Sequence, residues 1–325
     1  MERFVFIAAV TIAILFGVGA MFAGPHFNFH IDAEGRGTSP IVEVAPGTMA
    51  AQTFAGSYID IRSAAANVTV IPEDRTDVSV EIDNSAGVAP MPTVTLEGDS
   101  VIIDGQLRGR IHDCGGESLT LRGYGDVTLT QLPRITIRSP RAVDVDRSGA
   151  GSTDIGAAES VSLDFSGCGA ATIGDVAGEL DLDIAGAGDI TAGSARHVTA
   201  DIAGAGDITL GAIAAGADLD IAGAGTITIA SLTGDLSTDA AGASNIRIDG
   251  GSIGTAEIDM AGSGDLEIAA NVATLSASIM GVGDIDVGGT VGDLDVDIAG
   301  PGSVTVQAVT GSMQQDFSQF LILHN

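Results

Sequence analysis

The nonapeptide DIAGAGDIT occupies residues Asp183–Thr191 and occurs again, unchanged, at Asp201–Thr209. Related segments continue in both directions along the chain, and successive starts are 18 to 20 residues apart. The ten starts are Asp146, Asp164, Asp183, Asp201, Asp220, Asp239, Asp259, Ser278, Asp297 and Asp316. A near-constant period of this length is typical of a solenoid, in which each repeat packs only on its neighbours.

Within one repeat, apolar and polar residues alternate, which is the period of a β-strand. In the repeat at Asp220, we expect Leu219 and Ile221 to point inward and Asp220 to point outward. Glycines interrupt this alternation after each strand, because a tight corner between stacked coils leaves no room for a Cβ atom. Each repeat is therefore expected to contain two or three short strands separated by glycine corners.

This pattern predicts an all-β protein, a right-handed parallel β-helix with coils of about 19 residues. A strand that recurs once per coil can pair in parallel with its copy one turn later, at about 4.8 Å, and parallel crossovers favour the right hand. One inward-facing position of the coils forms a ladder of mostly large apolar residues. Its members are Phe165, Ile184, Ile202, Ile221, Ala240, Met260, Ile279, Ile298 and Phe317.

The chain divides into four segments. Residues 1–23 contain an apolar run that indicates a signal peptide or an N-terminal membrane anchor, and in both cases an exported body. Residues 24–53 are expected to be a linker, and residues 54–145 to be irregular coils or a cap of the solenoid, with a separate small β-domain as the alternative. Residues 146–325 are the regular repeats. Their last stretch, QFLILHN, departs from the glycine pattern and is expected to cap the open end or to contact a second copy.

The two parts of the chain differ in charge. The formal net charge is −30, from 43 acidic and 13 basic residues, and every basic residue is arginine. Up to Arg147 the chain has 18 acidic residues and 11 arginines, and beyond it 25 acidic residues and two arginines. The repeats are therefore expected to repel nucleic acid and anionic membranes, and to favour cations, basic partners or simple solubility.

Aspartates of the repeats align in two columns. Nine of the ten starts form the first column, and Asp189, Asp207, Asp265 and Asp284 belong to the second. Stacked carboxylates about 5 Å apart repel one another, and Ca²⁺, which takes hard oxygen ligands, would relieve that repulsion. A solvated acidic face is the main interpretation. The alternative is a Ca²⁺ site, and its candidate ligands are Asp183, Asp201, Asp220, Asp189 and Asp207.

Other chemistry has weaker signals. A β-helix can carry a polysaccharide lyase or hydrolase, which needs a pair of acids in a groove, but no pair stands out here and the repeats lack Trp and Tyr. We therefore expect no enzyme activity and no cofactor other than the Ca²⁺ alternative. After export, Cys114 and Cys168 would meet an oxidising compartment, and both a disulfide and free thiols remain open.

Several stretches of the sequence resemble one known family. The order is FAGSYIDIRSAAANVTVIPE, GDSVIIDG, LPRITIRSPRAVDVDRSGAG and then repeated AGAGDI corners, such as Ala203–Ile208. Over roughly residues 54–312 this order resembles the head GIN domain family, also named "putative auto-transporter adhesin". The resemblance implies an exported right-handed β-helix, and it brings no catalytic residues.

Together these features predict an exported, non-enzymatic, acidic β-solenoid that takes part in interactions at the cell envelope or surface. The expected location is the periplasm, the outer membrane or the cell surface, or the periplasmic side of an inner-membrane anchor. The expected partner is a protein or a glycan, with no nucleic acid, and with membrane contact only through an uncleaved N-terminus. A Ca²⁺-binding envelope protein and a carbohydrate-active enzyme are the alternatives.

Overall fold

The computed structural model describes residues 44–115, 118–317 and 321–323. The predicted signal or anchor segment, residues 1–23, and most of the predicted linker therefore lie outside the described residues. Residues from Ile41 onward form one compact unit. None of the described residues forms a helix long and apolar enough to cross a membrane.

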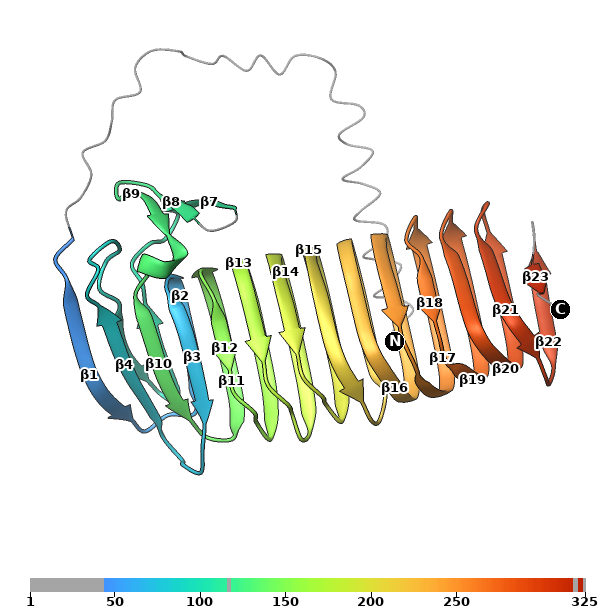
Figure 1. Ribbon diagram of the computed structural model, residues 1–325, viewed down its shortest axis with the longest axis horizontal. Coiled ribbons are helices and arrows are strands. Elements are labelled where there is room, and N and C mark those ends of the chain that lie inside the picture. The colour runs from blue at the N-terminus through green and yellow to red at the C-terminus, as the bar shows by residue number, and fades with distance from the viewer. Residues whose placement is uncertain (1–43, 116–117, 318–320, 324–325) are drawn as a thin grey trace, which may run out of the picture. The chain divides into compact units, whose positions relative to one another are not determined.

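The regular repeats form a parallel β-solenoid of about nine turns, as the sequence predicts. Each coil pairs in parallel with the next, so that Asp183 lies opposite Asp201 and Asp201 opposite Asp220. Figure 1 shows the coils side by side, from green through yellow to red. The strands of this array are β11 (Ala142–Ala150), β12 (Thr153–Ile155), β13 (Ser160–Ile173), β14 (Glu179–Ala192), β15 (His197–Ile213), β16 (Ala217–Ile248), β17 (Gly251–Gly262), β18 (Leu266–Ile268), β19 (Asn271–Gly281), β20 (Asp284–Ala299) and β21 (Ser303–Val309).

Each coil turns sharply at its glycine corner and so contributes to two long sheets. The segments before the corner, such as 179–185, stack into a sheet that we call the first face, and the segments after it, such as 189–192, stack into the second face. A short third side closes the coil and carries isolated bridges such as Ala195 to Ile213. The predicted two or three strands per coil are therefore present.

The apolar ladder predicted from the sequence fills the inside of the stack. Its members from Phe165 to Ile298 are 1% to 9% exposed, and all of them belong to one continuous cluster of buried residues. The side chain of Phe317 lies outside the described residues. Because each coil buries its apolar side chains only against its two neighbours, the stack as a whole stabilises every coil.

At the N-terminal end, the parallel stack changes into antiparallel strands. On the first face, the order outward is β11 (Ala142–Ala150), β2 (Tyr58–Ala65), β6 (Ser100–Asp104) and β5 (Thr93–Glu97). On the second face, it is β12 (Thr153–Ile155), β3 (Asn67–Pro72), β10 (Arg134–Ser139), β4 (Val78–Asn84) and β1 (Gly47–Phe54). The pairs β5–β6, β4–β10 and β1–β4 are antiparallel, so these strands end the solenoid.

The strand β1 lies where the sequence suggests the end of a linker. Its sequence, GTMAAQTF, has no clear alternation, and most of its residues are exposed. An edge strand of this kind is held by backbone hydrogen bonds to one neighbour, here β4. Periodicity detects buried faces, and β1 has almost none, which explains why the pattern did not reveal it.

A small separate sheet is inserted between β6 and β10. It consists of β7 (Ile111–Gly115), β8 (Ser118–Leu121) and β9 (Gly125–Thr128), and the 3-10 turn η1 (Leu129–Gln131) follows it. Leu107, Leu119, Leu121 and Val127 contribute to its own buried cluster. A disulfide joins Cys114 of this sheet to Cys168 in a glycine corner of β13, with the Cα atoms 6.0 Å apart.

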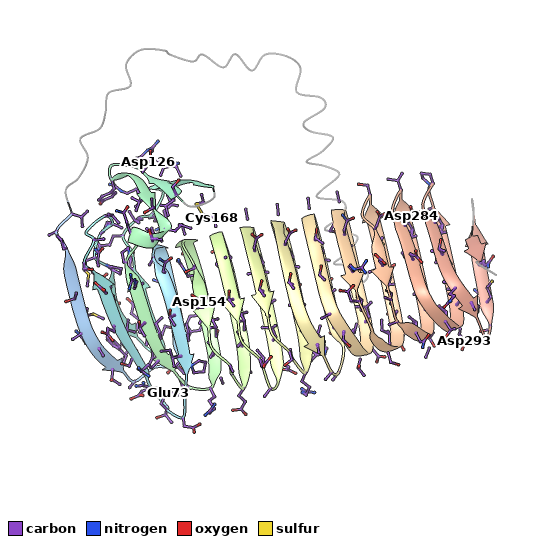
Figure 2. All side chains as sticks on the ribbon, in the orientation of Figure 1. Glu73, Asp126, Asp154, Cys168, Asp284 and Asp293 are labelled. Atoms are coloured by element: carbon purple, nitrogen blue, oxygen red, sulfur yellow. A yellow bond between two sulfur atoms is a disulfide. The ribbon has the colours of Figure 1, made fainter. Side chains whose placement is uncertain are left out.

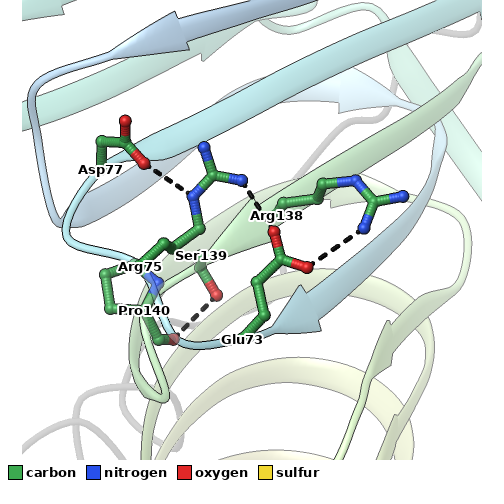
Figure 3. A network of polar contacts seen from close by, with 6 residues as sticks. All are labelled: Glu73, Arg75, Asp77, Arg138, Ser139 and Pro140. Atoms are coloured by element: carbon green, nitrogen blue, oxygen red, sulfur yellow. Dashed lines mark hydrogen bonds and ion pairs between the residues drawn. The ribbon is translucent and has the colours of Figure 1, made fainter.

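A network of ion pairs lies at the turn between β3 and β4 and includes Arg138 of β10 (Figure 3). Arg75 donates to Asp77 at 2.7 Å and to Glu73 at 2.9 Å, and Arg138 donates to the other oxygen of Glu73 at 3.2 Å. Arg75 and Arg138 thus balance carboxylates at this end, in the part of the sequence that has the smaller net charge.

At the C-terminal end, the stack continues beyond the regular pattern. The strand β22 (Met313–Phe317) pairs in parallel with β20, and β23 (Leu321–Leu323) pairs in parallel with β21. The described part of the final stretch is therefore a further layer of both faces, even though it lacks corner glycines.

Arginine occupies one inward-facing position of the ladder. Arg147 lies in register with Phe165 and is 1% exposed. Its guanidinium donates to the carbonyl oxygens of Ala64, Ala66, Ser148 and Ala150 at 2.8 to 3.1 Å. This buried arginine therefore ties strand β2 of the N-terminal end to β11, the strand that begins the regular array.

Candidate functional site

The first predicted column of aspartates lies on the outside of the first face. Strand pairing places its members directly opposite one another on successive coils, with Ser278 as the single neutral member among the ten repeat starts. We call this row of side chains the carboxylate column. It includes three of the five candidate calcium ligands, Asp183, Asp201 and Asp220, on consecutive coils.

The structure adds Asp60 to the carboxylate column. Asp60 of β2 lies opposite Asp146, although it precedes it by a long stretch of chain. It is only 5% exposed, and its Oδ2 accepts a hydrogen bond of 2.7 Å from Nε of Arg62, while its Oδ1 has no partner. Sequence periodicity missed Asp60 because the segment between the two residues folds elsewhere, and only the pairing of β2 with β11 brings them together.

The structure shows a further row, which was not predicted from the sequence. It runs beside the carboxylate column on the first face, two residues earlier in each coil. Acidic and hydroxyl side chains alternate along it from coil to coil, so that its charge density is half that of a continuous column. Its members are Asp144, Ser162, Asp181, Thr199, Asp218, Ser237, Glu257, Ser276 and Asp295. This alternation was not recognised in the sequence, and it limits the repulsion between neighbouring carboxylates on this face.

The predicted second column, which contains Asp189 and Asp207, has a different environment. It lies just after the glycine corner, where each Oδ1 accepts the backbone N–H of the equivalent residue one coil later. Asp189 accepts from Asp207 at 3.3 Å, Asp207 from Thr226 at 3.1 Å and Asp284 from Ser303 at 2.9 Å. The five candidate ligands therefore divide between two separate rows, and the corner row has one oxygen per carboxylate engaged in holding the stack.

Another corner of the coils repeats this arrangement. Oδ1 of Asp175 accepts both the N–H and the hydroxyl of Ser194 at 2.8 Å, and Oδ1 of Asp293 accepts those of Ser312 at 2.8 and 2.7 Å. Figure 2 shows Asp284 and Asp293 at opposite corners of the C-terminal coils. These hydrogen bonds lower the pKa of Asp175 and of Asp293, since they stabilise the charged form.

Four members of the carboxylate column have pKa values that shift upward instead. Partial burial, and then the neighbouring carboxylates, raise the pKa of Asp146, Asp164 and Asp201. For Asp239, burial together with Asp259 and Asp220 raises the pKa to about 6. At these four positions the charged carboxylate is destabilised, whereas the charged forms of Asp175 and Asp293 are stabilised.

No three His, Cys, Asp or Glu side chains of the described residues come together in a group that could hold a metal ion. An open hollow of about 460 Å³ lies on the third side and is lined by Arg141, Glu159, Asp175, Ser194 and several small residues. Arg141 is occupied by an ion pair with Asp74. The most extensive chemical feature is therefore the row of equivalent side chains along the first face.

A β-solenoid with a long, repetitive outer face belongs to a class of proteins that present an extended surface. The chain belongs to the family described as "Putative auto-transporter adhesin, head GIN domain", whose model matches residues 57–252 and 236–312. This confirms the family that the sequence resembles. The description points to an exported or surface protein that resembles adhesins.

Solved structures of low sequence identity are similar to the chain. A "Putative lipid binding protein" from Parabacteroides distasonis ATCC 8503 has 17% identity and a TM-score of 0.37, and covers 84% of this chain and 96% of its own. A "putative adhesin" from the same strain has 12% identity and a TM-score of 0.38, with 84% and 98% covered. Another from Parabacteroides merdae ATCC 43184 has 12% identity and a TM-score of 0.35, with 80% and 95% covered. No curated protein matches the chain significantly.

Proposed function

We propose that the protein is an exported, non-enzymatic component of the cell envelope or cell surface that acts through contacts along its solenoid. The observation that carries this proposal is the family match over most of the chain. The repetitive first face supports it, since equivalent side chains on consecutive coils suit a long partner that makes many weak contacts. The partner class is a protein or a glycan.

Labelling and attachment together test this proposal. Intact cells that produce the full chain are labelled with an antibody against the coils, before and after permeabilisation, and beads coated with the protein are then applied to cells or immobilised glycans. We expect labelling of intact cells and attachment above that of beads coated with an unrelated protein of similar net charge. Labelling only after permeabilisation places the contacts inside the envelope, and a cytoplasmic signal contradicts the proposal.

A second candidate is a cation-stabilised envelope protein in which Ca²⁺ binds the carboxylate column. The raised pKa values of Asp146, Asp201 and Asp239 favour it, because a divalent cation relieves the same repulsion that a proton relieves. The unpartnered Oδ1 of Asp60 offers one more oxygen at the end of the row. In this candidate Asp183, Asp201 and Asp220 are the ligands on the column, and Asp189 and Asp207 would serve a separate ion in the corner row through their second oxygens.

Thermal melts at pH 7.5 in Ca²⁺, in chelator and in NaCl of matched ionic strength test the second candidate. We expect Ca²⁺ to raise the midpoint saturably by about 5 °C beyond NaCl. The variant Asp201→Asn/Asp220→Asn should lose this increment, while Asp154→Asn/Asp286→Asn, with the same charge change on the second face, should keep it. Equal midpoints in Ca²⁺ and NaCl exclude the site.

Protons provide an internal control for the same melts. A pKa that is higher in the folded than in the unfolded protein means that the folded state binds the proton more tightly. The free energy of unfolding should therefore rise as the pH falls from 7.5 to about 5, a range that includes the pKa of about 6 of Asp239. Below about pH 4 it should fall again, as the corner carboxylates with lowered pKa values, Asp175 and Asp293, become protonated.

A further inference from the structure

The small sheet β7–β9 carries a cluster of arginines that differs from the others in the chain. Arg108, Arg110 and Arg122 are all exposed, and no carboxylate of the described residues forms an ion pair with them. Six of the other described arginines do pair with carboxylates: Arg62, Arg75, Arg138, Arg141, Arg196 and Arg247. Of the two remaining described arginines, Arg147 is buried and Arg134 lies in β10, so three of the four exposed arginines without an ion pair lie in the turns of the small sheet.

Backbone contacts hold these arginines together. The N–H of Arg122 donates to the carbonyl of Arg110 at 2.7 Å, and the N–H of Arg110 donates to the carbonyl of Leu107 at 2.9 Å, which closes the turn that contains Arg108. The guanidinium of Arg110 lies over the ring of Tyr124, 6.0 Å from its centre. Three guanidinium groups and one aromatic ring thus share two adjacent turns.

The platform beneath this cluster is fixed at several points. The Cys114–Cys168 disulfide ties the sheet to the corner of β13, and Leu107, Leu119 and Leu121 are buried beneath it. Figure 1 shows the sheet projecting beyond the ends of the neighbouring coils, and Figure 2 places Cys168 at that junction. Because the backbone of this site is already ordered, less of the binding free energy is spent on ordering it when a ligand binds.

We propose that Arg108, Arg110, Arg122 and Tyr124 form a binding site for the sulfate or phosphate ester groups of an anionic glycan. A guanidinium presents its N–H donors as a planar fork that matches two oxygens of such a group. Three forks on adjacent turns suit a ligand with several anionic groups along a chain. Tyr124 is half-buried against the leucine cluster and packs against the Arg110 guanidinium, so it positions that group for the ligand.

The charge of the rest of the protein favours a glycan chain over a membrane. Charges within about 8 Å of each other still interact at physiological ionic strength. A flat anionic membrane that reaches the arginines would also approach the acidic coils, which would repel it. A flexible chain can reach the projecting sheet without approaching the first face. The inference rests on the proposed envelope role, which brings the protein to such a partner, and it names the chemistry of that partner.

Binding of the full chain, in a nonionic detergent, to immobilised dextran sulfate tests the site, with uncharged dextran as the reference. We expect saturable binding in 150 mM NaCl that weakens as salt is added and that inorganic phosphate competes away. The variant Arg108→Gln/Arg110→Gln/Arg122→Gln should bind at least about 30-fold more weakly. The control Arg134→Gln/Arg138→Gln/Arg196→Gln, with the same change in net charge, should stay within about twofold.

Two further variants separate the site from the folding of the sheet. Arg108→Gln/Arg122→Gln leaves the contacts of Arg110 with Tyr124 and with the Arg122 carbonyl in place, and it should still weaken binding about tenfold. Arg108→Lys/Arg122→Lys keeps the charge but removes the forks, and it should weaken binding severalfold. Circular dichroism and an intact disulfide in each variant confirm that the sheet is folded.

The outcomes distinguish this proposal from the proposed function. Absence of binding to dextran sulfate, or an equal loss in the control variant, overturns the site. Arginine-dependent binding to vesicles of phosphatidylglycerol and phosphatidylcholine, without binding to dextran sulfate, assigns the cluster to lipid headgroups and overturns the glycan. Cell attachment that the triple variant retains leaves the surface function intact and removes this cluster from it.

Discussion

Replacing Gly204 by alanine is expected to break the solenoid in its middle. Gly204 lies in the corner row between Gly186 and Gly223, in register with both. A Cβ atom added there would lie 2.0 Å from the carbonyl oxygen of Gly186 and 3.0 Å from its backbone nitrogen and carbon. Because all three are backbone atoms of the neighbouring coil, no side chain can move away, and the two coils must separate.

The expected cost exceeds about 4 kcal/mol, at the upper end of single substitutions. In a solenoid each coil is stabilised by its neighbours, so one broken interface weakens the layers on both sides of it. The measurement is a thermal melt combined with hydrogen exchange, in which peptides from β14 and β15 should lose protection first.

Gly288 provides the matched control for this substitution. It lies in β20, and the nearest atom to an added Cβ is the carbonyl oxygen of Ile268 at 3.8 Å, an ordinary contact. Gly288→Ala should therefore leave the midpoint within about 2 °C of the unchanged protein. If Gly204→Ala melts at the same temperature as Gly288→Ala, close packing of the corners is not what requires glycine there.

These corners explain how much of the fold could be predicted from the sequence. A glycine is required wherever two backbones meet, and an apolar residue wherever a side chain enters the stack, so one coil repeats the requirements of the next. The period, the inward ladder and the parallel pairing follow from this repetition. The hairpin of β5 and β6 has an equally local cause, because its turn contains Gly98, whose φ is 65°.

The parts that escaped prediction depend on single contacts between distant segments. Asp60 joins the carboxylate column only through the pairing of β2 with β11. Two cysteines are too few to establish a disulfide, and its presence depends on where the small sheet folds. The structural role of Asp189 and Asp207, which accept backbone N–H groups of the next coil, was not predicted either. In the sequence an aspartate looks the same whether its carboxylate is solvated or accepts such a hydrogen bond.

Arg147 is the clearest case, since an arginine in an inward-facing position contradicts the apolar pattern. Burial lowers its pKa to about 10, and no carboxylate of the described residues forms an ion pair with it, yet the group still carries its charge at neutral pH. Its four hydrogen bonds to carbonyl oxygens replace the water it loses, but its Nε has no partner. The free energy of burying this charge is therefore opposed by its contacts with β2 and β11.

We expect Arg147→Ala to destabilise the N-terminal end by about 3 kcal/mol, because four carbonyl oxygens lose a donor and a cavity remains. Peptides from β2 should then exchange their amide hydrogens faster, while those from β19 and β20 should be unchanged. Arg147→Met fills the cavity but offers no donor, so its stability should lie between those of the unchanged protein and Arg147→Ala. Arg196→Ala, which removes an exposed arginine, should have little effect. A more stable Arg147→Met protein would show instead that desolvation of the charge outweighs its hydrogen bonds, as it does for some buried ion pairs. The arginine would then fix the register between the N-terminal strands and the array at a cost in stability.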